Sequence, residues 1–196
     1  DRRLSTNPLA IGVPLAGGDP AILDITTSTV AEGKLMVALN KGERVPEGWI
    51  VDKDGNPTTD PKDFYDGGAL LTIGAHKGSG LSMLTDLLAG AITTGRSSDP
   101  DDTVLRNNML SIYIAPATYD ASGGVLAEAK RFVDYVKGSP PAAPGQPVQG
   151  PGDVERRTRA DRRANGVPLD DTTWNDLIEA AKSVGIDARH AERMLR

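Results

Sequence analysis

The residues of this sequence best suited to bind an anion lie in a glycine-rich segment, residues 74–80, Gly-Ala-His-Lys-Gly-Ser-Gly. The segment follows an apolar run and precedes leucines at helical spacing, so it is expected to be a turn that leads from a strand into a helix. Its glycines would leave backbone N–H groups free to face a phosphate, and Lys77 adds a positive charge. The spacing matches neither the Rossmann fingerprint nor the P-loop, so on spacing alone a structural turn is the favoured interpretation.

Composition argues against several other kinds of chemistry. The 196 residues include no cysteine, which removes disulfides, thiolate nucleophiles and cysteine-based metal sites. The two histidines, His76 and His190, are too few and too distant for a typical zinc or non-haem iron site, so no metal is expected. No apolar run is long enough to span a bilayer, and no signal-peptide core follows the first residues. We therefore expect a cytoplasmic protein without a membrane partner.

The formal net charge of −5 argues against a nucleic-acid partner, because such binding depends largely on clustered Lys and Arg. The local exception is an arginine-rich stretch, residues 156–163. Asp153, Glu155 and Asp161 belong to the same predicted helix, and that helix has no interleaved aromatic side chains for base stacking. A solvated face or a subunit contact is therefore the preferred interpretation of the arginines.

Strands and helices are expected to alternate along the chain, which predicts an α/β fold. Short buried strands are expected where apolar and β-branched residues gather, over residues 9–14, 21–26, 69–73 and 109–114. Helices are expected from Thr29 to a stop at Gly42, after the glycine-rich turn, over 125–136, over 153–165, after Asp170 or Asp171, and over 187–195. Residues 43–68, rich in Pro, Gly, Asp and Asn, predict an exposed excursion.

Three segments are expected along the chain. Residues 1–137 form the α/β domain, residues 138–152 form a proline-rich linker that cannot pack a core, and residues 153–196 form C-terminal helices. The last of these carry an apolar stripe with Trp174 that needs a partner surface. Because the first residue is Asp1 and not methionine, an initiator or an upstream segment is expected to have been removed or to lie elsewhere.

Several motifs of the chain occur in the order in which they occur in one enzyme family. They are Thr-Asn-Pro-Leu-Ala-Ile-Gly-Val-Pro at 6–14, Ile-Leu-Asp-Ile-Thr-Thr-Ser at 22–28, the 46–61 excursion, His-Lys-Gly-Ser-Gly-Leu at 76–81, and the tail from 151 to 170. Over essentially its whole length the chain resembles the type-2 malate/L-lactate dehydrogenases, most closely the hydroxycarboxylate dehydrogenase branch. The resemblance implies a non-Rossmann NAD(P)-binding α/β fold with a mixed sheet, flanking helices and a C-terminal helical segment. It also implies a homodimer and hydride transfer between NAD or NADP and a small 2-oxo or 2-hydroxy acid.

The resemblance also implies site residues. Asp24, at the end of a strand, would contact the cofactor and orient and charge-stabilise a histidine acid/base, whereas by itself it would be interpreted as a turn or cap residue. For Asn107 the register is open by one residue, because Asn108 follows it, and for residues 152–155 a helix N-cap is the plain interpretation. The other cofactor-binding residues implied are Ile25, Thr26, Thr27, His76, Lys77, Gly78, Asn107, Gly152, Asp153, Val154 and Glu155.

The chain also departs from the family pattern. Family members carry, upstream of the matching region, a Ser-His-Gly-type motif that supplies the catalytic histidine and an arginine for the substrate carboxylate, and this sequence does not contain them. They are expected on an upstream segment or a second chain, so this chain alone is not expected to complete the chemistry. Two alternatives stay open: reduction of a cyclic imine carboxylate, and a non-catalytic nucleotide-binding fragment or subunit.

Overall fold

The computed structural model describes residues 2–99, 101, 104 and 106–186. The described residues divide into two compact units, each built from separate stretches of the chain. Unit 1 contains Arg2, residues 29–71 and residues 166–186, and unit 2 contains residues 3–28 and 72–165. The helix expected over 187–195 lies outside the described residues. The partition into 1–137, 138–152 and 153–196 stays a prediction.

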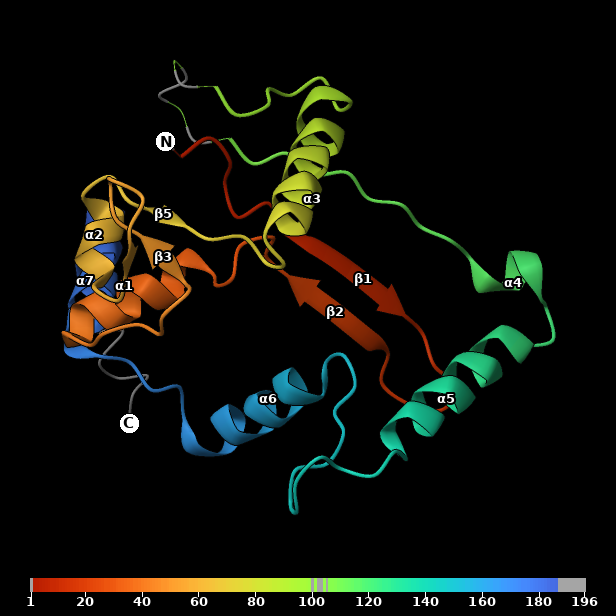
Figure 1. Cartoon of the computed structure of the whole chain (residues 1–196). Coiled ribbons are helices and arrows are strands. Elements are labelled where there is room, and N and C mark those ends of the chain that lie inside the picture. Colours follow the sequence, from red (N-terminus) through yellow and green to blue (C-terminus); the bar gives the residue numbers. More distant parts are fainter. Residues whose placement is uncertain (1, 100, 102–103, 105, 187–196) are drawn as a thin grey trace. The chain divides into compact units, whose positions relative to one another are not determined.

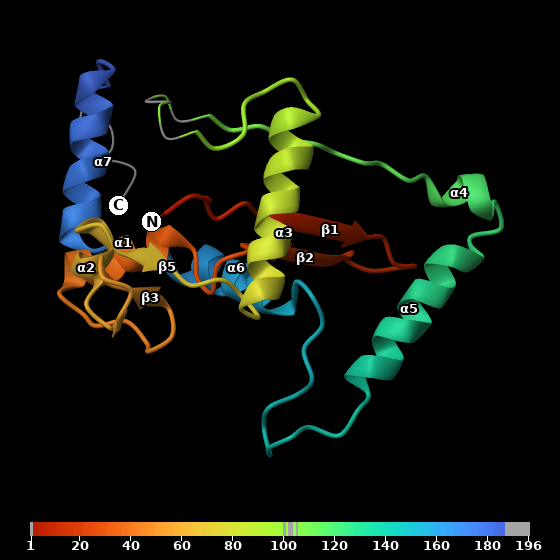
Figure 2. The same cartoon turned by 45° about the horizontal axis from the view of Figure 1, so that its top comes forward.

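Unit 1 combines a small antiparallel sheet with three helices (Figures 1 and 2). In the sheet, the central strand β3 (Ile50–Val51) pairs with β4 (Pro57–Thr58) on one side and with β5 (Ala69–Leu70) on the other. Ile50 lies opposite Thr58 and Leu70. Helix α7 (Asp171–Ser183) contacts α1 (Glu32–Lys41), which places α7 in this unit. The elements of unit 1 are α1 (Glu32–Lys41), β3 (Ile50–Val51), β4 (Pro57–Thr58), α2 (Pro61–Tyr65), β5 (Ala69–Leu70) and α7 (Asp171–Ser183).

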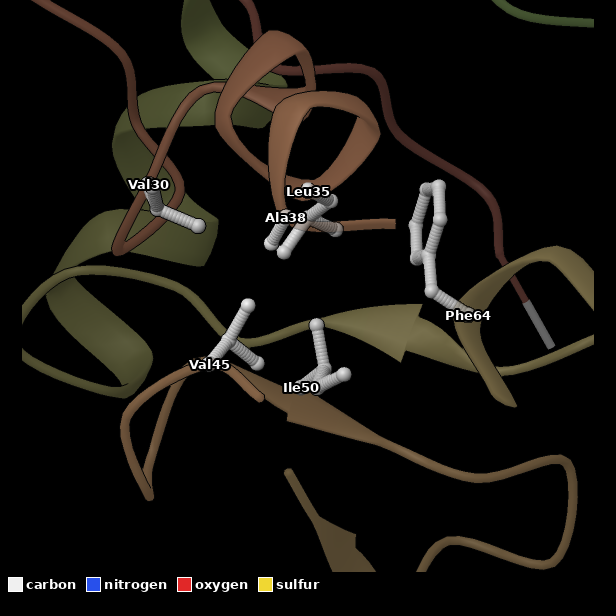
Figure 3. Close-up of a cluster of buried hydrophobic side chains, with 6 residues drawn as sticks. All are labelled: Val30, Leu35, Ala38, Val45, Ile50 and Phe64. Carbon is white, nitrogen blue, oxygen red and sulfur yellow. The ribbon is translucent and has the colours of Figure 1, made fainter. Parts of the chain in front are cut away.

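The buried hydrophobic cluster belongs to unit 1 (Figure 3). Leu35 and Ala38 point from α1 toward Ile50 of β3, and Leu35 and Ile50 are completely buried. The cluster consists of Val30, Leu35, Ala38, Val45, Ile50 and Phe64. The predicted exposed excursion over 43–68 is therefore wrong in part, since it supplies half of this core. Its apolar residues are Val45 and the two short runs 49–51 and 64–65, set among turn residues, and such short segments do not show by themselves that they are buried.

Two helix boundaries of unit 1 follow from local signals that the sequence displays. Gly42 ends α1 in a left-handed conformation with φ 67°, and its N–H bonds back to the last carbonyls of the helix. Asp170 is the N-cap of α7, and its carboxylate accepts hydrogen bonds from the N–H and hydroxyl of Thr173. Both boundaries confirm the expectations, with Asp170 as the cap in place of Asp171.

Unit 2 contains a two-stranded antiparallel hairpin and several helices (Figure 1). In the hairpin Leu9 pairs with Ile25 and Val13 with Ala21. Among the described residues all strand pairing is antiparallel and falls into two small sheets, so the helix-and-strand composition is confirmed but a single mixed sheet is not found. The elements of unit 2 are β1 (Leu9–Val13), β2 (Ala21–Ile25), α3 (His76–Asp86), the π-helix η1 (Leu87–Ala91), α4 (Pro116–Tyr119), α5 (Gly124–Lys137) and α6 (Asp153–Asn165).

Three expectations about strands are corrected. Residues 109–114 are extended but form no strand in the described part of the chain, and Tyr113 is 92% exposed. Strand propensity is expressed only where a neighbouring strand accepts the ladder hydrogen bonds, and no described segment lies there to do so. The expected strand 69–73 is also shorter, because Thr72 and Ile73 leave β5 to pair with Ser28 and Thr27. Strands β1 and β2, expected to be buried, expose Ile11 and Ile22 by about half.

Candidate functional site

The end of β2 and the glycine-rich turn meet through their backbones in unit 2. The N–H of Ile73 donates a 3.0 Å hydrogen bond to the carbonyl of Thr27, and Ser28 forms a bridge with Thr72. Two stretches far apart in sequence, 24–28 and 72–78, are therefore neighbours. Both contain residues that the sequence predicted to bind the cofactor.

The threonines after β2 use their hydroxyls within the protein. Thr26 donates its hydroxyl proton to the carbonyl of Ser28 at 2.9 Å, and Thr27 donates its own to the carbonyl of Thr6 at 2.9 Å. A hydroxyl has one proton to donate, so each oxygen can now act only as an acceptor. Thr27 is 1% exposed, which means that its side chain fixes the end of β2 against residue 6.

The turn before α3 is shorter than its glycines suggest. Gly74 has φ 57°, Ala75 has φ 53° and ψ −118°, and helix α3 starts at His76. The hydroxyl of Thr72 donates a 2.7 Å hydrogen bond to the carbonyl of Ala75, which holds the turn in this unusual conformation. His76 and Lys77 are exposed at the first turn of α3. There the backbone N–H of Lys77 donates to the carbonyl of Gly74 at 3.2 Å and that of Ser79 to the carbonyl of Ala75 at 3.3 Å, which leaves the N–H groups of His76 and Gly78 for an anion.

Gly78 and Gly80 lie inside α3, so the expectation that they belong to the turn is wrong. A Cβ on Gly78 would lie 2.2 Å from the carbonyl oxygen of Ile73, whereas one on Gly80 would meet nothing within 4 Å. Gly78 therefore lets the helix approach the backbone that carries the bond to Thr27. The sequence does not show which of the two glycines has this role.

Two residues that the sequence reasoning did not select also fix α3. The side-chain amide of Asn7 donates hydrogen bonds to the carbonyl of Ser82 at 3.0 Å and to its hydroxyl at 3.1 Å. Ser82 is 1% exposed and lies on the same helix as His76 and Lys77. A buried polar residue on a helix is a signal that a partner must exist, but the sequence alone does not identify Asn7.

Asp24 is exposed in β2, where it pairs with Ala10 of β1. The N–H of Ile22 donates to the carbonyl of Pro151 at 3.3 Å, so the peptide of Ile22 faces the outer edge of β2. Peptide groups alternate along a strand, and the peptide of Asp24, two residues further on, faces the same edge. The segment that precedes α6 therefore lies along the strand that carries Asp24.

Asp153, the first residue of α6, is the most strongly paired acid of the site. Its carboxylate accepts from Lys137 Nζ at 2.7 Å, from the N–H of Gly150 at 2.7 Å and from Arg156 Nη2 at 2.5 Å. The Lys137 hydrogen bond first, and then those of Gly150 and Arg156, hold the pKa of this carboxyl far below its usual range. The adjacent Val154 and Glu155 are exposed.

Asn107 is exposed, and the hydrogen bonds of the described residues do not join it to 24–28 or 72–78. The neighbouring Asn108 donates from its side-chain amide to the carbonyl of Arg96 at 3.0 Å and lies against Gly95. Among the residues that the structure describes, no cluster of three His, Asp or Glu side chains is arranged to hold a metal ion. No described helix is both long and apolar enough to cross a bilayer.

The comparison with protein families agrees with the motifs at these positions. The family model for malate/L-lactate dehydrogenase matches residues 1–178. The chain belongs to this family of dehydrogenases.

Individual relatives extend this assignment. The chain is 37% identical over 190 residues to an L-lactate dehydrogenase of Cupriavidus necator, an alignment that covers 94% of this chain and 54% of that enzyme. It is 52% identical over 93 residues to a Delta(1)-pyrroline-2-carboxylate/Delta(1)-piperideine-2-carboxylate reductase of Pseudomonas putida, covering 47% of this chain and 27% of that enzyme. An E. coli structure described as a malate/lactate dehydrogenase superposes with a TM-score of 0.82 at 30% identity, over 98% of this chain and 55% of that chain. The chain thus spans about half the length of the relatives that it matches along its whole length.

Proposed function

We propose that this chain supplies the cofactor-binding part of an NAD(P)-dependent dehydrogenase that acts on a small 2-hydroxy or 2-oxo acid, in a non-Rossmann arrangement. One observation carries the proposal. The hydrogen bond from Ile73 to Thr27 brings the strand of Asp24 next to the first turn of α3, where Lys77 is exposed. A carboxylate and an anion-binding helix end then lie on adjoining segments of one unit.

The donor set at the start of α3 fits the phosphates of a dinucleotide. The positive end of the helix dipole, the remaining N–H groups of His76 and Gly78 and the charge of Lys77 attract an anion, and the exposed His76 side chain adds a hydrogen-bonding imidazole. Gly78 keeps the helix close to Ile73 and so fixes the direction of those N–H groups. When bound, the nicotinamide ring supplies the hydride chemistry.

The proposed role of Asp24 is electrostatic. In the described part of the chain its carboxylate makes no hydrogen bond or ion pair, so it is available to hold an imidazolium supplied from elsewhere in the protein. Ile25 and the N–H of Thr26 are proposed to line the cofactor site beside Asp24, and the hydroxyl oxygen of Thr26 can still accept a hydrogen bond. Gly152, Val154 and Glu155 approach from the segment that lies along β2. Asn107 is also proposed as a cofactor contact, on the resemblance alone.

The full enzyme is further proposed to be a cytoplasmic homodimer. The exposed apolar side chains of α5, including Phe132 at 57% and Tyr135 at 72%, offer surface for packing against another chain or segment. Sedimentation of the natural full-length protein at several concentrations tests the subunit number, and a concentration-independent monomer contradicts it.

A second candidate function is reduction of a cyclic imine that carries a carboxylate. The specific support is the 52% identity over 93 residues to the Pseudomonas putida reductase. A C=N and a C=O beside a carboxylate pose similar geometric demands. Assays of the full-length protein with both substrate classes separate the candidates: activity with an imine and none with 2-oxo acids contradicts the first.

Cofactor binding is tested by fluorescence titration of the natural full-length protein with NADH and with NADPH. Lys77→Met should weaken binding about ten- to a hundredfold, since it removes a charge-assisted contact worth roughly 1.5–3 kcal/mol. Lys34→Met is the matched control, because Lys34 is exposed on α1 in unit 1. Absence of binding by the unaltered protein, or equal losses in both variants, would contradict the proposed site.

A further inference from the structure

The segment that precedes α6 is tied to two other parts of unit 2 through one carboxylate. Asp153 accepts from Lys137 Nζ at the C-terminal end of α5 and from Arg156 Nη2 one turn along α6, at 2.7 and 2.5 Å. It also accepts from the N–H of Gly150 at 2.7 Å. The Asp153 side chain is only 19% exposed, so these bonds are partly shielded from water.

Arg156 continues the connection to the hairpin. Its Nη1 donates to the carbonyl of Pro20 at 3.0 Å, and its Nε lies 4.0 Å from a carboxylate oxygen of Asp19. Beside it, the N–H of Ile22 donates to the carbonyl of Pro151 at 3.3 Å. The guanidinium thus joins Asp153 to the turn from which β2 starts.

Gly152 has the backbone shape and the small size that this arrangement needs. Its φ of +90° lies in the region that L-residues with a side chain rarely adopt. A Cβ there would lie 3.0 Å from Arg156 Nη1 and 3.5 Å from the carbonyl oxygen of Ile22. Glycine at this position lets the guanidinium and β2 lie close to the loop at the same time.

We infer that Asp153, Lys137 and Arg156 form a positioning clamp that fixes the loop 150–152 and the start of α6 against β2. An ionised carboxylate has about four lone-pair directions, and three donors already occupy this one. Asp153 therefore acts as a positioning residue, and Gly152, Val154 and Glu155 are the groups left to face the cofactor. The inference rests on the proposed function for its role, while the clamp itself rests on the contacts of unit 2.

The distinguishing experiment is a double-mutant cycle on cofactor affinity in the natural full-length protein. Asp153→Asn and Lys137→Met should each weaken binding of NADH or NADPH by about tenfold. The double variant should be little weaker than either single variant, because both changes break the same clamp. Lys130→Met is the matched control: this lysine is also on α5 but pairs with Asp134. If Asp153 were instead a direct cofactor ligand, Lys137→Met would keep full affinity for the cofactor, and that result would overturn the inference.

A second measurement is independent of any cofactor. Amide hydrogen exchange at Ile22 should be slow in the unaltered protein and faster in Asp153→Asn and in Lys137→Met, with the melting temperature followed to separate local loosening from global unfolding. If the unaltered protein binds neither cofactor, the proposed function fails, and Ile22 exchange still decides whether the clamp exists. Unchanged Ile22 exchange in both variants overturns the clamp whatever the affinities show.

Discussion

The N–H of Ile73 and the carbonyl of Thr27 are joined by a 3.0 Å hydrogen bond, and this backbone contact sets the geometry of the candidate site. Both partners are main-chain groups, so the junction does not depend on the identity of either side chain. It depends on how closely α3 can approach, and therefore on Gly78. The site is consequently more sensitive to added volume in α3 than to conservative changes in the strand.

Gly78→Ala should destabilise unit 2 by about 1–3 kcal/mol, because the new Cβ would lie 2.2 Å from the Ile73 oxygen. Gly80→Ala, on the same helix with open space around its Cβ, should instead be neutral or stabilise by up to about 1 kcal/mol. Urea unfolding of the two variants measures the difference. Equal effects would show that the close approach of α3 to Ile73 is not what constrains Gly78.

Ala75→Gly should cause no loss of stability. Ala75 has φ 53° and ψ −118°, a conformation that costs a residue with a side chain on the order of 1–3 kcal/mol and glycine much less. Glycine also raises the conformational entropy of the unfolded chain, which costs about 0.4–1 kcal/mol of stability, so the net effect should be neutral or stabilising. The same substitution at Ala127, inside α5, should destabilise by about 1 kcal/mol. Thermal unfolding of both variants measures the two changes in stability. A greater loss of stability in Ala75→Gly than in Ala127→Gly would contradict the positive-φ conformation of Ala75.

Leu35→Ala should cost about 2–5 kcal/mol of folding free energy, since Leu35 is fully buried in the cluster of unit 1. The neighbouring Met36, 42% exposed on the same helix, provides the control: Met36→Ala should change stability by no more than about 0.5–1 kcal/mol. Chemical denaturation monitored by the fluorescence of Trp49, which packs on this cluster, gives the values. A Leu35 variant as stable as the Met36 variant would contradict the assigned core.

The dependence of the unfolding free energy on acid pH should reveal the Asp153 clamp. Hydrogen bonds from Lys137, Gly150 and Arg156 lower the pKa of Asp153 in the folded state, so its stabilising contribution is fully present above the unfolded pKa of about 3.9. As the pH falls below about 4, the unfolded state takes up the proton first, and the contribution is lost progressively toward the lower folded pKa. The difference in unfolding free energy between the unaltered protein and Asp153→Asn should therefore be flat above about pH 5 and shrink below it. A difference that is constant down to about pH 2 would mean that this carboxylate is not held by the clamp.

Some of this structure could be predicted from the sequence because the information is local. Gly42 and Asp170 mark helix ends through the chemistry of one or two residues, and the helices they bound were expected. Residues 109–114 have strand propensity, but propensity does not supply a neighbouring strand. Val45 stands alone among polar and turn residues and Phe64 has only Tyr65 beside it, and their burial depends on α1, a different part of the chain.

In the candidate site, too, local signals identify some residues and long-range contacts determine the rest. Asp24, His76 and Lys77 were found through residue type and resemblance, and the structure brings their two segments together. The contacts that fix those segments, from Asn7 to Ser82 and from Asp153 to Lys137, join residues that no local pattern relates. Asp153 was expected to bind the cofactor because residues 152–155 resemble a loop that closes over it, and only the three donors to Asp153 indicate the positioning role.

Residues 29–71 contain all six residues of the buried cluster, and the N–H of Thr29 donates to the carbonyl of Leu71 at 2.8 Å, which closes this stretch at its two ends. During translation the stretch emerges from the ribosome before α3 does. Its core can therefore form early. Residues 5–28, which include the β1–β2 hairpin and emerge before this stretch, must wait for Ile73 and Ser82 to emerge, because Ile73 bonds to Thr27 and Ser82 bonds to Asn7. Residues 5–28 thus precede this core along the chain and yet complete their contacts only after it can form.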